Sequence, residues 1–108
     1  MKEIKAFIHR NRISDVVHAL KNAKLNKIYC NLSISDVSGN LDALDNKEKD
    51  YSIEFGEGFI TEAKLELICE DESAEEAIQI IQLHGRTGQD NAGWVYVLDI
   101  SRIEGIKN

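Results

Sequence analysis

"EAKLELICEDESAEEAIQIIQLHGRTGQDNAGWVYVLDI", residues 62–100, contains a strand pattern, a helix pattern and a second strand pattern in one continuous stretch. Apolar residues alternate over 62–69, which predicts a strand with one buried face. They then recur at helical spacing, and the apolar stripe consists of Ala74, Ala77, Ile78 and Ile81. Residues 93–100 are almost continuously apolar and β-branched, which predicts a strand buried within a sheet. The stretch therefore predicts a β-α-β unit.

The ends of the predicted helix carry their own signals. Ser73 and Glu76 form an S-x-x-E capping box, which predicts Ser73 as the N-cap. Gly85 follows the last apolar position and fits a C′ residue in the left-handed conformation. We therefore expect a helix within 71–85, followed by a loop over 86–92.

The first half of the chain shows the same order of patterns. Residues 2–9 predict a strand whose apolar face carries Ile4, Ala6 and Ile8. Helical spacing follows over 11–24, with Asn11 as the predicted N-cap and with the stripe Ile13, Val16, Val17 and Leu20. Residues 28–37 alternate again, which predicts a second strand with one wet face.

Two β-α-β halves predict an α+β domain of the ferredoxin-like class. In that class a four-stranded antiparallel sheet carries two helices on one face. A chain of 108 residues has room for a single core, so we expect one domain over 1–108. The uncovered face of the sheet favours oligomerisation.

The composition excludes several classes of function. The formal net charge of −6 argues against a nucleic-acid partner, because affinity for phosphate comes from clustered Lys and Arg. No apolar run approaches the roughly 18 residues that a membrane span needs, so we expect no direct membrane insertion. The charged N-terminal residues do not resemble a signal peptide, and a cytoplasmic location is expected.

The cysteines and histidines do not form a recognisable site. Cys30 and Cys69 are far apart and each lies in a strand pattern, so they are interpreted as buried free thiols, with a structural disulfide left open. His9, His18 and His84 lie in three different predicted elements without metal-ligand spacing, so no metal site is expected. No catalytic motif is present, and the chain is not expected to be an enzyme.

A polar, glycine-flanked segment, residues 39–58, separates the two halves; we call it the arm. From Asp36 to Glu57 the sequence has seven acidic residues and two lysines. The segment also contains the apolar residues Leu41, Leu44, Tyr51, Ile53 and Phe55. Either it is a solvated insertion, or it becomes ordered on binding a partner.

Residues 86–93, RTGQDNAG, form the second informative loop. Glycines free the backbone so that several N–H groups can point at one anion, and Gly88 and Gly93 lie where such a loop needs them. Thr87 adds a hydroxyl donor and Arg86 is the nearest cation. The alternative is a plain turn between the helix and the strand. The loop follows a helix and precedes a strand, which excludes a Walker-type phosphate loop.

Taken in order, four segments resemble the PII signal-transduction family. Residues 1–20 resemble its first strand and helix, 33–39 the entry to its long T-loop, 63–81 its third strand and second helix, and 86–100 its nucleotide-contacting B-loop and following strand. The resemblance implies a homotrimer with adenine nucleotides bound between subunits. It also implies that the T-loop docks on a target protein, often a membrane transporter, an efflux system or a metabolic enzyme.

Carried over by position, the resemblance implies that Thr87, Gly88 and Gly93 belong to the phosphate-facing loop and that Gly39 is the hinge of the arm. Two lysines of the family's B-loop are replaced here by Gln89 and Trp94. Because charge-assisted hydrogen bonds to phosphate are worth about 1.5–3 kcal/mol each, we expect weak ATP binding and a relative preference for ADP or AMP. The alternatives are a trimeric interaction module without a nucleotide and a metal-responsive ferredoxin-like trimer.

Overall fold

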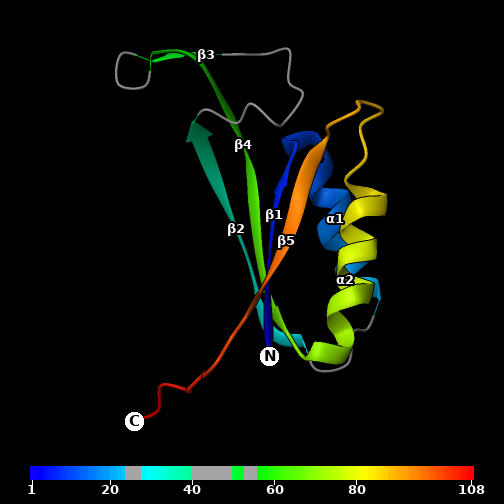
Figure 1. The fold of residues 1–108 in the computed structure, drawn as a ribbon, viewed down its shortest axis with the longest axis vertical. Coiled ribbons are helices and arrows are strands. Elements are labelled where there is room, and N and C mark those ends of the chain that lie inside the picture. The colour runs from blue at the N-terminus through cyan, green and yellow to red at the C-terminus, as the bar shows by residue number, and fades with distance from the viewer. Residues whose placement is uncertain (24–27, 40–49, 53–55) are drawn as a thin grey trace.

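The computed structural model in Figure 1 describes residues 1–23, 28–39, 50–52 and 56–108, with the backbone alone for 28–31, 50–52 and 56–61. Its elements are β1 (Lys2–Ile8), α1 (Arg10–Asn22), β2 (Ile28–Gly39), β3 (Asp50–Ser52), β4 (Gly56–Cys69), α2 (Asp71–His84) and β5 (Gly93–Asp99).

The main sheet has the strand order β2-β4-β1-β5, and every neighbouring pair is antiparallel. The short strand β3 pairs with β4 outside this path. Both helices cover the same face of the sheet (Figure 1). This arrangement confirms the predicted ferredoxin-like fold.

The core lies between the helices and the sheet. The strands contribute Ile4, Ala6, Ile8, Ala63, Leu65, Leu67 and Cys69, and the helices contribute Val16, Leu20, Ala74, Ala77 and Ile81, all of them buried. Alternate positions of a strand point to one face, and positions three and four apart share one side of a helix, so the apolar patterns meet in a single layer. The predicted apolar faces of β1, β4 and both helices are confirmed.

Neither of the described helices lies over the opposite face of the sheet, and we call it the open face. Residues directly paired across antiparallel strands point to the same side. The register pairs Lys5 with Glu66 and Tyr96, and it pairs Phe7 with Lys64 and Trp94. The open face therefore combines charged and aromatic side chains.

The predicted helix ends were wrong in three places. Helix α1 begins at Arg10 with His9 as the N-cap residue, so Asn11 lies inside its first turn. Helix α2 begins at Asp71 with Glu70 as the N-cap residue. Neither N-cap side chain makes a capping hydrogen bond. At α1 the reason is tertiary: the carboxylate of Glu62 on β4 accepts the hydrogen bond of the Arg10 N–H at 2.8 Å.

The other two corrections concern α2. The Ser73 N–H donates to the carbonyl of Glu70 at 3.0 Å, so the capping box predicted at Ser73 and Glu76 is not the start of the helix. Asp71 and Glu72 in the first turn provide the negative charge that a helix N-terminus favours. Gly85 has φ −83° and ψ −2°, which is right-handed and not left-handed, and its N–H donates to the carbonyl of Ile81.

The last strand was also predicted incorrectly. Strand β5 lies at the end of the strand order, and Tyr96, Val97 and Leu98 are about 40% exposed (40%, 39% and 41%). Its apolar run therefore does not reflect a central position. Strands β2 and β4 extend beyond the predicted 28–37 and 62–69, toward the arm. Within the arm, the side chains of Leu41, Leu44, Tyr51, Ile53 and Phe55 lie outside the described residues.

Candidate functional site

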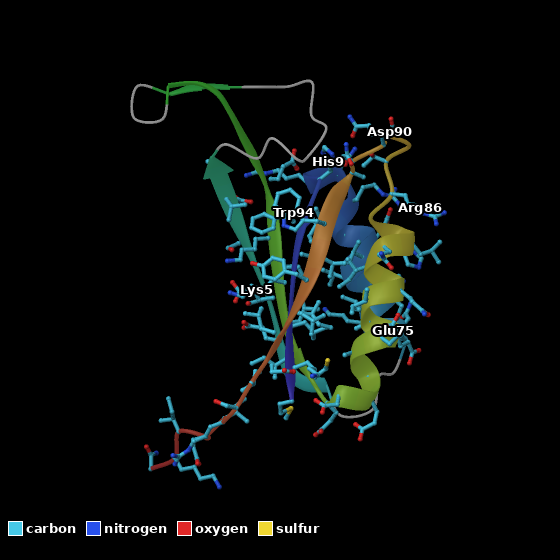
Figure 2. All side chains as sticks on the ribbon, in the orientation of Figure 1. Lys5, His9, Glu75, Arg86, Asp90 and Trp94 are labelled. Atoms are coloured by element: carbon cyan, nitrogen blue, oxygen red, sulfur yellow. The ribbon has the colours of Figure 1, made fainter. Side chains whose placement is uncertain are left out.

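A pocket of about 590 Å³ lies where the loop after α2 turns back onto β1. Residues of β1, the last turn of α2, the loop and the start of β5 line it, and Gln82, Arg86 and Trp94 are among them. Figure 2 shows Trp94 on the side of β5 away from the helices and Arg86 at the end of α2. The volume lies within the range of small-molecule pockets, about 300–1,000 Å³.

Two glycines shape the backbone beside this pocket. Gly88 has φ +86° and Gly93 has φ +152°, both in the region that favours glycine. A Cβ atom at Gly93 would lie 2.1 Å from the carbonyl oxygen of Phe7, so a side chain there would collide with β1. The two predicted glycines thus have backbone reasons for their identity, and their role toward a ligand stays a prediction.

Thr87 makes its contacts within the loop. Its hydroxyl donates to Gln89 Oε1 at 2.9 Å and accepts the hydrogen bond of the Gln89 N–H at 3.3 Å. This local turn stabilises the loop, as Thr hydroxyls commonly do. Thr87 lies in the loop but not among the described residues that line the pocket, and its hydroxyl is already paired.

The charge around the pocket is small. Of the described residues that line it, Arg86 is the one with a charged side chain. Asp90 lies exposed farther along the same loop, as Figure 2 shows. Among the described lining residues, the site can therefore offer one guanidinium to an anion.

An aromatic pair forms the other part of the site. The rings of Phe7 and Trp94 are stacked, with centroids 4.7 Å apart and an interplanar angle of 30°. The ammonium of Lys64 lies 5.9 Å from the centroid of the Phe7 ring, at the distance of a cation–π contact. Trp94 is half-buried in the single chain. Phe7 was missed, although the alternation of β1 already placed it opposite the core.

A buried contact between a histidine and a carboxylate lies at the junction of β1 and α1. His9 Nδ1 is 3.3 Å from Glu62 Oε1, and both side chains are at least nine-tenths buried. The next residue, Arg10, places its guanidinium 3.0 Å from Asp36 Oδ2. These contacts tie the junction to β4 and β2, the two strands that lead into the arm.

Gly39, the predicted hinge, is the last residue of β2 and pairs with Ile60. Among the described residues, none would lie within 4 Å of a Cβ atom at Gly39. The described part of the chain therefore gives no steric reason for glycine there, and the hinge role stays a prediction.

The described residues hold no group of three or more His, Cys, Asp or Glu side chains that could bind a metal ion. His18 is exposed and lies 3.0 Å from the Asn22 side-chain amide. Burial raises the pKa of the Cys69 thiol, which disfavours the reactive thiolate. Cys30, the other predicted thiol, has a side chain outside the described residues.

Among the helices that the structure describes, none is long and apolar enough to span a membrane.

Comparisons with known proteins agree with the fold. The family model described as nitrogen regulatory protein P-II matches residues 1–108. The nitrogen regulatory protein P-II 1 of Methanothermobacter thermautotrophicus is 25% identical over 100 residues, which cover 93% of this chain and 84% of that protein. The nitrogen regulatory protein P-II of Pasteurella multocida is 24% identical over 103 residues, which cover 95% of this chain and 88% of that protein. The similarity extends over nearly the whole chain at low identity.

Proposed function

The chain belongs to the nitrogen regulatory protein P-II family, and from this premise we propose that it senses a small ligand in the pocket beside residues 85–93. Membership of this family makes the chain a PII-like regulatory protein. The finer proposal is that ligand binding changes the arm and that the arm then regulates a partner protein. A transporter, an efflux system or a metabolic enzyme is the proposed class of partner.

The observation that carries the proposal is the pocket itself. It combines a volume suited to a small molecule with a loop that has two positive-φ glycines, of which Gly93 lines the pocket. It also lies at the end of the sheet where the His9–Glu62 pair joins β1 to β4. A ligand at this end is therefore close to the strands that lead into the arm.

Adenine nucleotides are the proposed ligand class. Arg86 is the one charged residue among the described residues that line the pocket. The additional phosphates of ATP therefore add little binding affinity over ADP or AMP. Two missing charge-assisted hydrogen bonds correspond to about 3–6 kcal/mol, or roughly two to four decades of affinity for a triphosphate.

A homotrimer is the proposed assembly. The open face carries Tyr96 and Leu98 at about 40% exposed (40% and 41%), and a partner copy would remove this surface from water. Analytical ultracentrifugation measures the assembly directly, and a monomer at all concentrations would contradict it.

Calorimetry with AMP, ADP and ATP tests the sensing proposal. We expect saturable heat, and we expect the same ligands to change the rate of proteolysis within the arm. Arg86→Gln should weaken the binding of a phosphate-bearing ligand by about tenfold, since one charge-assisted contact is lost. The matched control is Lys21→Gln, which removes an exposed charge from α1. The absence of heat at millimolar nucleotide would overturn the nucleotide version.

The second candidate is an interaction module without a nucleotide. The internal pairing of the Thr87 hydroxyl favours it, because a ligand would have to compete with Gln89 for that hydroxyl. In this case deleting residues 41–56 abolishes capture of the partner protein, leaves the assembly intact, and no nucleotide changes either result.

A further inference from the structure

The first turn of α1 with its N-cap residue, residues 9–12, lies between the pocket and the strands that lead into the arm; we call it the bridging turn. Its ends are held to one another, because the Arg12 N–H donates to the carbonyl of His9 at 2.9 Å. Figure 2 shows His9 at the same end of the molecule as Asp90 of the loop. A hydrogen-bonded turn moves as a unit, so a displacement at one of its residues is passed to the others.

The bridging turn is attached to the pocket at two points. Ile8, which directly precedes the turn, lines the pocket and is 3% exposed. At the other end, Arg12 Nε donates to the carbonyl of His84, the last residue of α2, at 3.2 Å. The next residue, Gly85, also lines the pocket. A ligand that moves the end of α2 or of β1 therefore acts directly on the bridging turn.

The same turn is attached to the base of the arm, where 36–39 of β2 pair with 60–63 of β4. Glu62 belongs to this arm base, and its carboxylate makes two contacts with the turn. Oε1 lies 3.3 Å from His9 Nδ1, and Oε2 accepts the hydrogen bond of the Arg10 N–H at 2.8 Å. The side chains of His9 and Glu62 are only 10% and 4% exposed, so water screens their contact little.

The contacts of His9 favour a second arrangement of the turn. Its Nε2 is buried and has no hydrogen-bond partner among the described residues. A buried polar atom without a partner destabilises the arrangement that contains it. This lowers the free-energy difference to a shifted position in which Nε2 reaches a partner. A ligand that binds one of the two positions better shifts the population toward it.

We propose that the bridging turn couples the pocket to the arm, with Arg12 as the positioning residue on the pocket side and Glu62 as the positioning residue on the arm side. The inference rests on the proposed sensing at the pocket, and it names the route by which that site regulates the arm. Neither residue is among the described residues that line the pocket. Because coupling between two sites is reciprocal, a change at either end should be detected at the other.

Hydrogen exchange without nucleotide, in the unmodified chain and in Arg12→Met, measures this coupling. The substitution removes the donor to the His84 carbonyl and keeps a side chain of similar length. Exchange in 85–93 should become about three- to tenfold faster, since one hydrogen bond is lost. Exchange in the arm base should become about twofold faster or more. Arg12→Lys keeps a donor and should restore most of the protection in both regions.

Glu62→Gln is the reciprocal variant. It removes the charge that pairs with His9, and it should speed exchange in the arm base and, by about twofold or more, in 85–93. Arg10→Met is the matched control within the same turn. It removes a contact with Asp36 whose side chains are 52% and 68% exposed, and it keeps the backbone N–H that Glu62 accepts. Exchange in 85–93 should therefore be unchanged in Arg10→Met.

Exchange in β1 separates coupling from a general loss of stability, because Ile4 and Ala6 belong to the core. Faster exchange confined to 85–93 and the arm base supports the proposal. Faster exchange in 85–93 alone in Arg12→Met, or an equal increase in β1, overturns it. If Glu62→Gln does not fold, the Arg12 variants decide the question. If no nucleotide binds in calorimetry, the nucleotide version of the proposed function falls, whereas the coupling is still decided by the exchange data.

Discussion

On the helix-covered face of the sheet Ile4, Leu65 and Leu67 are fully buried, whereas on the open face Lys5 and Lys64 keep about a quarter of their side chains exposed (24% and 23%). The same two strands, β1 and β4, supply both sets. Successive residues of a strand point to opposite faces, so each strand contributes alternately to the core and to the open face.

The contrast between the buried apolar face and the partly exposed open face indicates where the candidate site can form. The pocket lies at the end of the sheet, where Ile8 belongs to the core and its neighbour Phe7 belongs to the open face. On the open face the charges are balanced locally, with Lys5 near Glu3 at 3.6 Å. The helix-covered face should therefore determine stability, and the open face should determine recognition.

Adjacent residues on β4 give the largest test of this division. Leu65→Ala removes a fully buried side chain and should lower the free energy of unfolding by about 2–5 kcal/mol. Lys64→Ala, one residue earlier, removes a partly exposed ion pair with Glu66 and should cost less than about 1 kcal/mol. Urea denaturation followed by circular dichroism measures both.

Equal losses in the two variants would contradict the division. If the proposed trimer covers the open face, the cost of Lys64→Ala should instead grow with protein concentration, because assembly stabilises the folded chain by mass action. The loss in the free energy of unfolding caused by Leu65→Ala is expected at every protein concentration.

The patterns that could be predicted from the sequence are those set by local periodicity. Alternation identified the buried face of β1 from Ile4, Ala6 and Ile8, and helical spacing identified the stripe that contains Val16 and Leu20. The exposure of β5 could not be predicted, because an apolar run describes the residues and not the position of the strand in the sheet. That position depends on which strands pair.

The site was predictable to the same extent. Gly88 and Gly93 could be identified because positive φ values restrict the residue type locally. The contact between Phe7 and Trp94 depends on the register of β1 against β5, which joins residues far apart in the chain. The ligand roles of Thr87 and Gly39 remain predictions.

A buried charge on β4 provides the second test. Alternation places Glu62 on the same side of β4 as Lys64 and Glu66, yet its side chain is only 4% exposed. The first turn of α1 has no acidic residue, so Glu62 supplies the negative charge at this helix end and also pairs with His9. Glu62→Gln keeps an acceptor oxygen but removes the charge, and it should lower the free energy of unfolding by about 1–2 kcal/mol.

Glu66→Gln is the matched control for this test. Glu66 is four residues along the same strand, about one third exposed (34%) and paired with Lys64. Its replacement should change the free energy of unfolding by less than about 0.5 kcal/mol. Equal losses in Glu62→Gln and Glu66→Gln would contradict the prediction, because they would show that the burial of Glu62 adds nothing to its effect on stability.

The smallest effect is expected at the opposite end of β1, where the carboxylate of an ion pair is exposed to water. The N-terminal ammonium of Met1 donates to Asp71 Oδ1 at 2.8 Å. This hydrogen bond lowers the pKa of Asp71 from its ordinary value of 3.8 and raises the pKa of the ammonium from 8.0. The stabilisation by the pair is therefore complete between these two values. It is lost as the pH falls through the lowered pKa of Asp71, or rises through the raised pKa of the ammonium.

Asp71→Asn should lower Tm by no more than about 2 °C between pH 4 and pH 8, since the carboxylate is 62% exposed and solvent screens the pair. The difference from the unmodified protein should shrink outside that range. Thermal unfolding at low salt over a series of pH values measures it. Glu72→Gln removes a neighbouring charge from the same helix turn and controls for the interaction with the helix dipole. A pH profile identical for the two variants would assign the effect to the helix end and not to the pair with Met1.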